Sequence, residues 1–499
     1  MDACYYYQGG RTISQGGGLS EKFLWNFLDN SPTITHPGYS YWMPLPSIVA
    51  AAGLWLFSDG FRAAQLPFLL LAALFPVFVA WMAIRWTQSK RIAVTAGFLS
   101  IFSGFYSVYW MNVESFLLYA WIGGLLLVIL PELRGKNNVF WPVVTGVLCG
   151  FAHLTRADGL LFPGLAVLFV FFIKAQSWKR RIGFILLIII GYATVIGFWY
   201  VRNISEFGGL FPPGNSHSLW LISYNDLFHF PATDLTPQRF LESGWKNLLA
   251  TRWEALLWNV QTLLFVMGFV FLAPFIACGI IKLHQQPSIK ISVAYFAALF
   301  FLMTLIFPLQ GSRGGLFHSS AALISVLAIA AAIGLDRAVA WIGHLRSWNP
   351  VLSQRIIFAG IIALAFFTSA WIFQTRVVGT DYNDPFWSRQ NSGYLNLANL
   401  LKISPSSDVR FMVNNPPCFT SQTEWEAVAI PDGDISALFR VANQYDIQYV
   451  ILDSNTPAEM RFLYTGDWTD ERLVKAGEWS EDGRRFVIYQ MQKNIMSLE

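Results

Sequence analysis

Long apolar runs dominate the chain between residues 61 and 376. A helix that crosses a membrane needs about 20 mostly apolar residues. Ten segments meet this requirement within the usual range of about 17–25 residues, allowing a few residues of error at each end: 61–86, 92–111, 114–133, 139–156, 159–175, 182–203, 256–282, 291–309, 317–342 and 356–376. A further apolar stretch, Pro44–Phe57, is too short to cross and is predicted to lie on the membrane surface. The pattern therefore predicts an α-helical polytopic membrane protein.

Composition supports a membrane location. Only 13% of the residues are charged, whereas soluble domains usually carry about 25%, so most of the chain cannot belong to a water-soluble protein. The net charge of +4 is too small to indicate a nucleic-acid partner. The four cysteines, Cys4, Cys149, Cys278 and Cys418, show no paired spacing. Neither a disulfide scaffold nor a zinc site is therefore expected.

The Lys and Arg residues of the short connections predict an orientation, because cytoplasmic loops are enriched in them. One set of connections carries Arg85, Lys90, Arg91, Arg134, Lys136, Lys174, Lys179, Arg180, Arg181, Lys282, Lys290, Arg337, Arg346 and Arg355. The alternate short connections carry only Arg156 and Arg313. The first set is predicted to be cytoplasmic, so residues 1–60, 204–255 and 380–499 are predicted to lie on the outer face.

This orientation has a consequence for the N-terminus. The first span runs from outside to inside, and an external N-terminus needs a preceding helix or signal to carry it across the membrane. Nothing before Asp2 has that character. We therefore expect one further transmembrane helix before Asp2, missing from this sequence through truncation or a misassigned start.

After Thr380 the sequence takes on the character of a soluble domain. Val409–Val413, Gln448–Asp453 and Arg485–Met491 are predicted strands, and Ile435–Tyr445 is a predicted amphipathic helix. Turns are predicted at Pro416-Pro417, Pro431-Asp432-Gly433 and Asp482-Gly483. The expected organisation is an external catalytic loop with a juxtamembrane helix over 1–60, a bundle of about ten helices over 61–376 with an external loop at 204–255, and a small outer α/β domain over 380–499.

Ionisable residues near membrane depth are costly and usually functional, and here they gather near the outer boundary. Asp2 is followed by an aromatic run that includes Tyr6, and a second aromatic run extends from His36 through Tyr41 and Trp42. A carboxylate beside an aromatic platform could act as general base for an acceptor hydroxyl. In the alternative interpretation the rings form an interfacial belt and Asp2 is a solvated terminus.

Two further groups stand out on the outer side. Glu114 opens a span and either takes part in chemistry or complements the helix N-terminus, which would contribute about 0.3–1 kcal/mol. The segment Gln310–Ser320 suits an anion such as a lipid-linked phosphate, because glycines flank Arg313 and a helix N-terminus is predicted near Phe317. In the alternative, Arg313 forms a structural ion pair with Asp158 or Glu114.

The order of these features resembles the GT-C superfamily of membrane glycosyltransferases, specifically the branch of protein O-mannosyltransferases and the aminoarabinose transferase of lipid A. The external loop of that branch starts Asp-Glu-x-x-Tyr, and Asp2-Ala3-Cys4-Tyr5-Tyr6 resembles it, with Ala3 in place of the second acid. His36–Leu45 resembles its "P-P-L-x-Y-W" element, and Phe61–Pro67 resembles "A-A-R-L-P". Glu114 falls where the branch has a second acidic residue, and Leu154-Thr155-Arg156 resembles "L-T-K".

The resemblance implies an inverting transferase that moves a sugar from a polyprenyl-phosphate donor to a hydroxyl on the outer face of the membrane. Asp2 would be the general base, Glu114 a second catalytic residue, and outer-face cations would bind the phosphate leaving group. No metal cluster lies beside these residues, so neither an essential metal nor a cofactor is expected, although some members of the superfamily use a metal. The candidate substrate-binding residues are Tyr6, His36, Tyr39, Tyr41, Trp42, Arg156, Asp158, Arg202, Arg313 and His318.

The sequence leaves the sugar open, and the acceptor could be a protein, a lipid or a glycan. The alternative is a transporter or flippase of a lipid-linked substrate, but such proteins typically have two related halves with a site at mid-depth, and the sequence has neither. A membrane protein whose outer domain binds a partner is a third hypothesis, which leaves Glu114 and Arg313 unexplained. A multi-pass protein of the cell membrane with an outward-facing site is expected.

Overall fold

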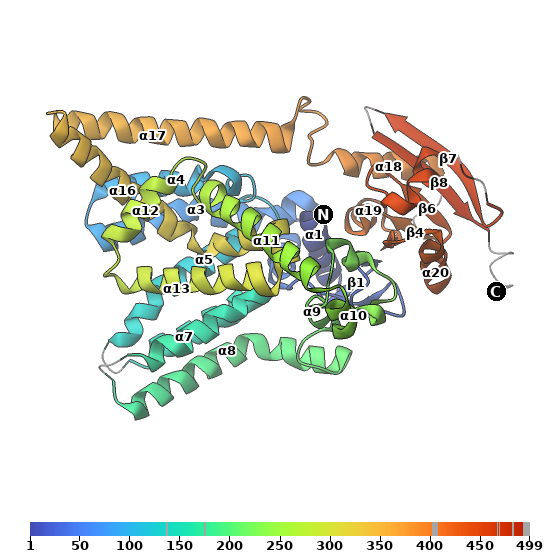
Figure 1. The fold of residues 1–499 in the computed structure, drawn as a ribbon, viewed down its shortest axis with the longest axis horizontal. Coiled ribbons are helices and arrows are strands. Elements are labelled where there is room, and N and C mark those ends of the chain that lie inside the picture. Colours follow the sequence, from blue (N-terminus) through green and yellow to red (C-terminus); the bar gives the residue numbers. More distant parts are fainter. Residues whose placement is uncertain are drawn as a thin grey trace.

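A computed structural model describes residues 1–135, 138–173, 176–401, 408–466, 468, 470–481 and 484–492. Helices form an elongated bundle, and a mixed sheet with its own helices lies at one end of it (Figure 1). The prediction of a helical membrane bundle with a small C-terminal α/β domain is confirmed. Lys136, Lys174 and the predicted turn at Asp482-Gly483 lie outside the described residues.

Among the described residues, six helices are long and apolar enough to cross a membrane. They are α3 (Phe61–Thr87), α5 (Ser115–Ile129) with its extension to Arg134, α8 (Trp178–Phe207), α13 (Pro287–Phe301) with its extension to Ile306, the segment Pro308–Leu345 that contains α16 (Ile324–Leu345), and α17 (Pro350–Phe373) with its extension to Val378. Shorter apolar helices are α2 (Leu45–Leu56), α6 (Phe140–Thr155), the stretch Ala157–Phe171 that contains α7 (Leu161–Phe171), and α12 (Ala273–Lys282).

Two of the predicted spans are interrupted. The span at 92–111 forms α4 (Lys90–Ile101), which stops shortly before Gly104, a residue with a φ of +64°. The span at 256–282 is divided between α11 (Trp245–Gln261) and α12, and Phe269 and Val270 between them adopt positive φ. Pro274 stands in the first turn of α12, where its missing N–H is tolerated. Hydropathy alone does not reveal such breaks, because the residues around them remain apolar.

The segment that contains α16 lies in the middle of the bundle. A Cβ atom at Gly279 of α12 would lie 1.9 Å from the carbonyl oxygen of Ala330 in α16, and a Cβ atom at Gly334 would lie 1.8 Å from that of Phe275. Small residues permit such close helix crossings in membranes. In its apolar window, Pro308–Leu345 is 89% buried, whereas Pro350–Val378 is only 22% buried. The exposed apolar surface of α17 is what contact with lipid requires.

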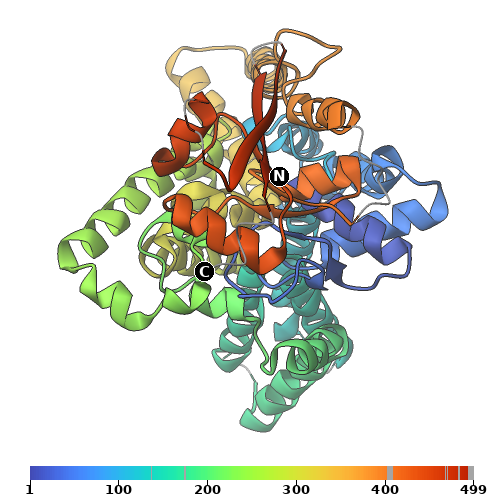
Figure 2. The same ribbon diagram turned by 90° about the vertical axis from the view of Figure 1, so that its right-hand side faces the viewer.

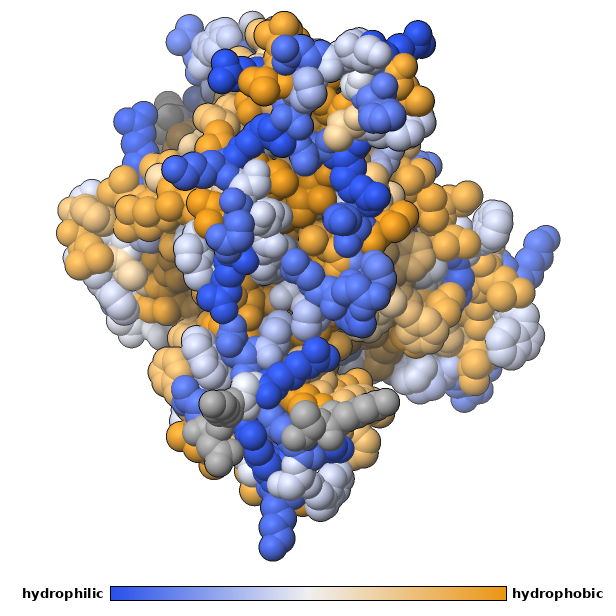
Figure 3. Space-filling view, turned by 90° about the vertical axis from the view of Figure 1, so that its left-hand side faces the viewer, coloured by the Kyte–Doolittle hydropathy of each residue, from blue (hydrophilic) through white to orange (hydrophobic). Residues whose placement is uncertain are grey.

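One end of the bundle carries the predicted cytoplasmic loops. The α7–α8, α12–α13 and α16–α17 connections lie at the left of Figure 1, away from the sheet domain. Seen from that side, hydrophilic side chains form a band bordered by hydrophobic ones (Figure 3). Ion pairs join neighbouring elements in this region, with Arg85 bound to Glu132 and Arg91 bound to Asp336. The basic connections therefore lie together, as their alternation predicts.

The C-terminal sheet has the strand order β2-β5-β4-β6-β8-β7, in which β2 (Phe23–Leu24) comes from the N-terminal segment. Its parallel part contains β4 (Arg410–Val413), β5 (Glu426–Ala429) and β6 (Tyr449–Leu452), and its antiparallel part contains β7 (Leu473–Glu481) and β8 (Arg484–Met491). The helices of the domain are α18 (Arg389–Leu401), α19 (Pro416–Thr423), α20 (Ile435–Tyr445) and the short α21 (Arg461–Thr465). The predicted strands and the predicted helix at 435–445 are confirmed. The turn predicted at Pro416-Pro417 is wrong, because these prolines open α19, where proline is favoured.

The N-terminal segment is built into both parts of the molecule. Residues 1–60 were expected to form a loop with one helix, but they also contain α1 (Asp2–Ser14), which packs against α2. The strand β1 (Ser20–Glu21) then pairs with β3 (His36–Pro37). The strand β2 (Phe23–Leu24) joins the C-terminal sheet beside β5. In Figure 2 this blue segment lies against the sheet domain, so the two ends of the chain form one structural unit.

A disulfide joins the same two regions. Cys4 of α1 is bonded to Cys418 of α19, with 4.9 Å between the Cα atoms. The prediction that no disulfide forms is therefore wrong. The two cysteines are separated by 414 positions, and spacing along the chain carries no signal for a pair that only the fold brings together. Cys149 and Cys278 are free thiols.

Candidate functional site

A cavity of about 600 Å³ lies where α1, the segment after β2, the turn after α6 and the start of the Pro308–Leu345 segment meet. Its wall combines carboxylates, cations and aromatic rings. Eight of the residues predicted from the sequence line it: Asp2, Tyr6, Tyr41, Trp42, Arg156, Asp158, Arg313 and His318. The fold therefore gathers into one cavity residues that are widely separated along the chain.

Asp2 begins α1 and faces His318 of α15 (Leu316–Ser320), with 3.9 Å between Oδ2 and Nε2. The His318 ring stacks on Phe116, with 4.0 Å between the ring centroids. Its Nδ1 is buried and has no hydrogen-bond partner within the described ranges. Stacking on α5 and the neighbouring Asp2 carboxylate therefore determine the position of this imidazole.

Glu114 immediately precedes α5 and is buried. Asn112 Nδ2 donates a hydrogen bond of 2.7 Å to Glu114 Oε1, while Oε2 has no partner among the residues that the structure describes. Burial and then the negative charge of Asp2 raise the pKa of Glu114 well above its usual range. The Glu114 side chain makes no capping hydrogen bond to α5. Glu114 does not line the cavity, but it lies near enough to Asp2 for the two charges to interact, and its burial favours the protonated form.

Arg156 and Asp158 form an ion pair in the turn after α6, with 3.1 Å between Nε and Oδ1. Ser319 completes the contact, because its hydroxyl accepts a hydrogen bond of 3.2 Å from Arg156 Nε and donates one to the Asp158 carboxylate. Both charged residues also line the cavity. The positive charge of Arg156 is therefore largely compensated by a neighbour two residues away.

Arg313 presents its charge to the cavity without such compensation. No described carboxylate lies within ion-pair distance of its guanidinium, which is 5.1 Å from the centroid of the Tyr224 ring. The ion pairs with Asp158 or Glu114 considered above do not form among these residues, and Asp158 pairs with Arg156 instead. Gly314 has a φ of +107°, a conformation that glycine adopts without the cost a side chain would bring. This bend precedes α15.

Aromatic rings form one wall of the cavity. Trp25 stacks on Trp42, with 4.5 Å between centroids and an interplanar angle of 16°. Tyr41 contacts Trp25 edge to face at 5.3 Å, and Tyr6 lies 5.9 Å from Trp42. Ring contacts of this kind contribute about 0.5–1.5 kcal/mol beyond the area they bury. The aromatic wall consequently consists of rings that pack against one another.

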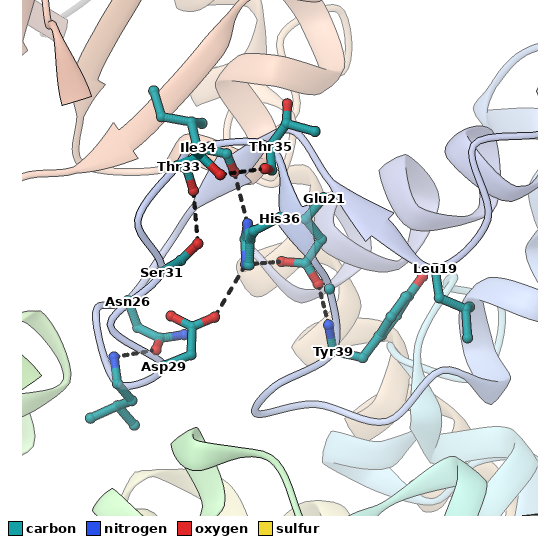
Figure 4. A network of polar contacts seen from close by, with 12 residues as sticks. Leu19, Glu21, Asn26, Asp29, Ser31, Thr33, Ile34, Thr35, His36 and Tyr39 are labelled. Atoms are coloured by element: carbon teal, nitrogen blue, oxygen red, sulfur yellow. Dashed lines mark hydrogen bonds and ion pairs between the residues drawn. The ribbon is translucent and has the colours of Figure 1, made fainter. Parts of the chain in front are cut away.

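His36 and Tyr39, two predicted substrate-binding residues, do not line the cavity. His36 Nε2 lies 3.3 Å from Asp29 and 3.9 Å from Glu21 (Figure 4). Glu21 also accepts hydrogen bonds from the Tyr39 backbone N–H, over 2.7 Å, and from the Tyr5 hydroxyl. Burial lowers the pKa of His36, but the hydrogen bond and charge of Asp29 and the charge of Glu21 raise it to about 9. The network fixes the segment that leads to Tyr41 and Trp42.

Arg202 also lies outside the cavity wall. Its guanidinium donates hydrogen bonds to the carbonyl oxygens of Leu19, over 3.1 Å, and Gly38, over 2.7 Å. It lies 5.0 Å from the centroid of the Trp199 ring on its own helix, α8. Arg202 therefore connects α8 to the end of the β1–β3 pair where Leu19 and Gly38 lie side by side, and its contacts are those of a structural residue.

Sequence reasoning did not include Trp25 and Tyr224 among the candidate residues, although both line the cavity. Trp25 follows the two-residue strand β2, which is too short to leave a periodic pattern. Tyr224 lies in the connection between α8 and α11, where no motif was recognised. These two rings are recognised as part of the site only in the structure, where Trp25 stacks on Trp42 and Tyr224 lies beside the Arg313 guanidinium.

The cavity therefore combines a carboxylate that can accept a proton, an arginine that can bind an anion, and a stacked aromatic wall. No group of three His, Cys, Asp or Glu side chains suited to a metal ion occurs in the described part of the chain. A hydroxyl and a phosphate could both be accommodated next to one another in this arrangement.

The sequence matches no protein-family model and no curated protein. Several solved structures are similar in fold, and two of them are structures of one protein. ArnT from Cupriavidus metallidurans bound to undecaprenyl phosphate has a TM-score of 0.58 at 14% identity, and ArnT from the same organism in the apo state has a TM-score of 0.56 at 15% identity. Each match covers 98% of this chain and 93% of that chain. The chain has the GT-C fold that the resemblance predicts, over almost its whole length.

Proposed function

We propose that this protein is a membrane glycosyltransferase that moves a sugar from a polyprenyl-phosphate carrier to a hydroxyl group of an acceptor. The fold it shares with ArnT supports this function, because one of the ArnT structures holds undecaprenyl phosphate. The observation that carries the proposal is the cavity of about 600 Å³, whose wall includes Asp2, Arg156 and Arg313 together with an aromatic surface.

In the proposed reaction, Asp2 accepts the proton of the acceptor hydroxyl. The hydroxyl oxygen forms a bond to the anomeric carbon of the sugar, on the side opposite the phosphate. The bond between that carbon and the phosphate oxygen breaks, so the configuration at the carbon is inverted and the electron pair leaves with the phosphate. Because the leaving group is a stable anion, it needs charge stabilisation more than a general acid.

Arg313 is the proposed main contact of the leaving phosphate. A guanidinium offers several N–H donors in a planar fork that matches phosphate oxygens, and no described carboxylate neutralises Arg313. Arg156 contributes less to the phosphate site, since Asp158 compensates most of its charge. His318, 3.9 Å from Asp2, is proposed to orient the carboxylate of the base and to contribute a polar edge toward the phosphate.

Glu114 is proposed to act in its protonated form. Two carboxyl groups close together in a buried site do not both ionise, and the more buried one retains its proton. Glu114 is buried, whereas the Asp2 side chain is 33% exposed. A neutral Glu114 places no second negative charge beside the carboxylate that is proposed as the general base.

The remaining predicted residues are assigned by their positions. Tyr6, Tyr41 and Trp42 belong to the ring wall and are proposed to contact the sugar or the first part of the lipid. Asp158 is proposed to hold Arg156 in place. His36, Tyr39 and Arg202 are proposed as positioning residues, because they hold the segment that carries Tyr41 and Trp42.

The site is proposed to face the outer side of the cell membrane. Disulfides form and persist outside the cytosol, and the Cys4–Cys418 bond lies two residues from Asp2. The basic connections lie at the opposite end of the bundle (Figures 1 and 3), where enrichment in Lys and Arg is typical of the cytoplasmic side.

A transfer assay with the purified full chain in lipid nanodiscs tests the proposal. It would use radiolabelled sugars on polyprenyl phosphate and envelope fractions as acceptor. Asp2→Asn should lower the transfer rate about 10²–10⁴-fold, the usual contribution of a general base, at unchanged thermal stability. The matched control is Asp234→Asn, since Asp234 is an exposed residue of the same outer region that pairs with His229 and lies outside the cavity.

An Asp2→Asn protein with wild-type transfer would refute the mechanism. Absence of transfer together with substrate counterflow in proteoliposomes would instead indicate the alternative, a transporter or flippase of a lipid-linked substrate.

A further inference from the structure

A second cavity, of about 300 Å³, lies at the junction of the C-terminal sheet and the outer connection between α8 and α11. Its floor is formed by residues that follow three neighbouring parallel strands. Asn414 and Asn415 follow β4, Ile430 and Asp432 follow β5, and Asn455 follows β6. The carboxyl ends of these three parallel strands therefore open into this cavity.

The topology of the sheet makes this a favoured place for a ligand. β4 lies between β5 and β6, so the chain leaves β4 toward one side through α19 and later crosses to the other side through α20. The loops after β4 and β6 therefore lead in opposite directions, and Asn414 Nδ2, directly after β4, donates a hydrogen bond to Asp453, directly after β6. In open α/β sheets ligands bind in the crevice outside the carboxyl ends of the strands, at the point where the strand order reverses.

The lining is polar and carries little charge. It includes four asparagine side chains, those of Asn225, Asn414, Asn415 and Asn455, and one carboxylate, that of Asp432, but no Lys or Arg among the described lining residues. Within the protein, Asn225 donates to Asp432 and Asn414 to Asp453, and the Asn415 side chain accepts from the Cys418 N–H, so each of these three amides has only its remaining donor or acceptor capacity for a ligand. Asparagine both donates and accepts hydrogen bonds, as an uncharged ligand rich in hydroxyl groups requires. Phe228 and Pro457 add apolar surface, against which the C–H face of a sugar ring can pack. An anionic ligand would not be favoured beside Asp432.

The two cavities adjoin each other at two places in the chain. Tyr224 lines the first cavity and Asn225 lines the second. Asp2 lines the first and Met1 lines the second. Consecutive Cα atoms are about 3.8 Å apart, so only the thickness of a single residue separates the polar cavity from the proposed general base.

We propose that this second cavity binds a sugar unit of the acceptor, so that the acceptor is a glycan or glycoconjugate whose reactive hydroxyl extends past Met1 to Asp2. The proposal rests on the transferase function proposed above and adds to it the chemical class of the acceptor. The C-terminal domain then supplies acceptor recognition, while the membrane bundle holds the lipid-linked donor.

Binding can be measured separately from transfer. The full chain in nanodiscs would be tested by saturation-transfer-difference NMR with methyl glycosides of common hexoses, pentoses and N-acetylhexosamines and with short oligosaccharides. At least one of these probes should bind to the wild type. Asn225→Ala and Asn455→Ala should each weaken binding about fivefold, the effect of one lost hydrogen bond of about 1 kcal/mol. Asn247→Ala is the matched control, because Asn247 is exposed on α11 and lies outside both cavities.

A second substitution distinguishes loss of ligand binding from loss of folding. Asn455→Trp adds a large ring at an exposed position of the cavity rim and should block the probe while the thermal unfolding midpoint stays at the wild-type value. Asp2→Asn should abolish transfer but retain glycoside binding, so failure of the transfer mechanism can be told apart from failure of this proposal. The proposal is overturned if no glycoside binds, if the Asn225 and Asn455 variants bind as the wild type does, or if polyprenyl phosphate displaces the glycoside.

Discussion

Cys4 and Cys418 are bonded to each other across almost the whole length of the chain, with 414 positions between them. The bond connects α1, which begins with Asp2, to α19 of the C-terminal domain. Arg11 of the same helix also pairs with Glu424, over 2.7 Å, at the end of α19. The helix that carries the proposed general base is therefore held from two sides, by the membrane bundle and by the outer domain.

Loss of this disulfide should weaken both the fold and the reaction. We expect Cys4→Ser with Cys418→Ser to lower the free energy of unfolding by about 2–5 kcal/mol. The transfer rate should also fall, because α1 loses a constraint two residues from Asp2. Thermal unfolding and transfer assays check both effects. Cys278→Ser is the control, since Cys278 is a free thiol of α12. A double variant as stable and active as the wild type would show that the bond does not position the helix.

The network around His36 should make stability depend on pH. In the native protein the hydrogen bond and charge of Asp29 and the charge of Glu21 outweigh the effect of burial and raise the pKa of His36 to about 9, compared with about 6.5 in an unfolded chain. The protonated form is therefore favoured by folding. The contribution of protonated His36 to the free energy of unfolding is fully present below about pH 6.5. This contribution, up to about 3 kcal/mol, is lost as the pH rises through about 9.

Unfolding measured between pH 6 and pH 9.5 tests the His36 prediction. The wild type should lose stability over this range, whereas His36→Gln should be less stable at pH 6 and show a flatter profile. His284→Gln provides the comparison, because His284 is exposed and lies far along the chain from the network. Parallel profiles for wild type and His36→Gln would contradict the assignment.

The two cavity arginines should respond differently to substitution. Arg313→Ala removes a guanidinium without an ion-pair partner in the described residues, so stability should hardly change while polyprenyl phosphate binds about 10–100-fold more weakly, as expected for a charge-assisted hydrogen bond. Arg156→Ala leaves Asp158, whose side chain is only 6% exposed, without its cation. That variant should be destabilised by about 3–5 kcal/mol.

Titration of nanodisc-embedded protein with polyprenyl phosphate and thermal unfolding separate the two effects. Arg62→Ala is the control for charge, because Arg62 is an exposed cation outside the cavity. If Arg313→Ala binds the lipid phosphate as tightly as the wild type does, Arg313 is not the phosphate contact.

The sequence predicted the bundle and much of the site because both depend on local patterns. Runs of apolar residues identify membrane helices, and the charged residues near the outer boundary, such as Asp2 and Arg313, stand out against them. Alternation and turn residues likewise revealed β4, α20 and β8, since each of these elements is long enough to have a period of its own.

Other features depend on contacts between distant segments. The strand β2 contains two residues and exists only because Phe23 and Leu24 pair with β5. The disulfide and the inclusion of Tyr224 in the cavity wall arise in the same way. His36 and Arg202 were selected as polar residues near the outer face, but polarity does not distinguish a ligand contact from a buried ion pair or a bond to a backbone carbonyl.

The raised pKa of Glu114 leads to a last prediction. A carboxyl group that stays protonated in the native state can be replaced by an amide, so Glu114→Gln should retain most of the transfer activity, while Asp2→Asn should lose it. The new side chain can still accept the Asn112 hydrogen bond at Oε1, and its NH₂ group can donate toward Asp2.

The same substitution should change how stability depends on pH. The native state of the wild type holds a proton on Glu114 that the unfolded chain releases above about pH 4.3, so wild-type stability decreases as the pH rises above that value. Glu114→Gln should remove this decrease and be the more stable protein at pH 8, as measured by chemical unfolding. Glu114→Ala, which leaves Asn112 without its acceptor, should lose both stability and activity. An inactive but folded Glu114→Gln protein would mean that Glu114 works as a carboxylate.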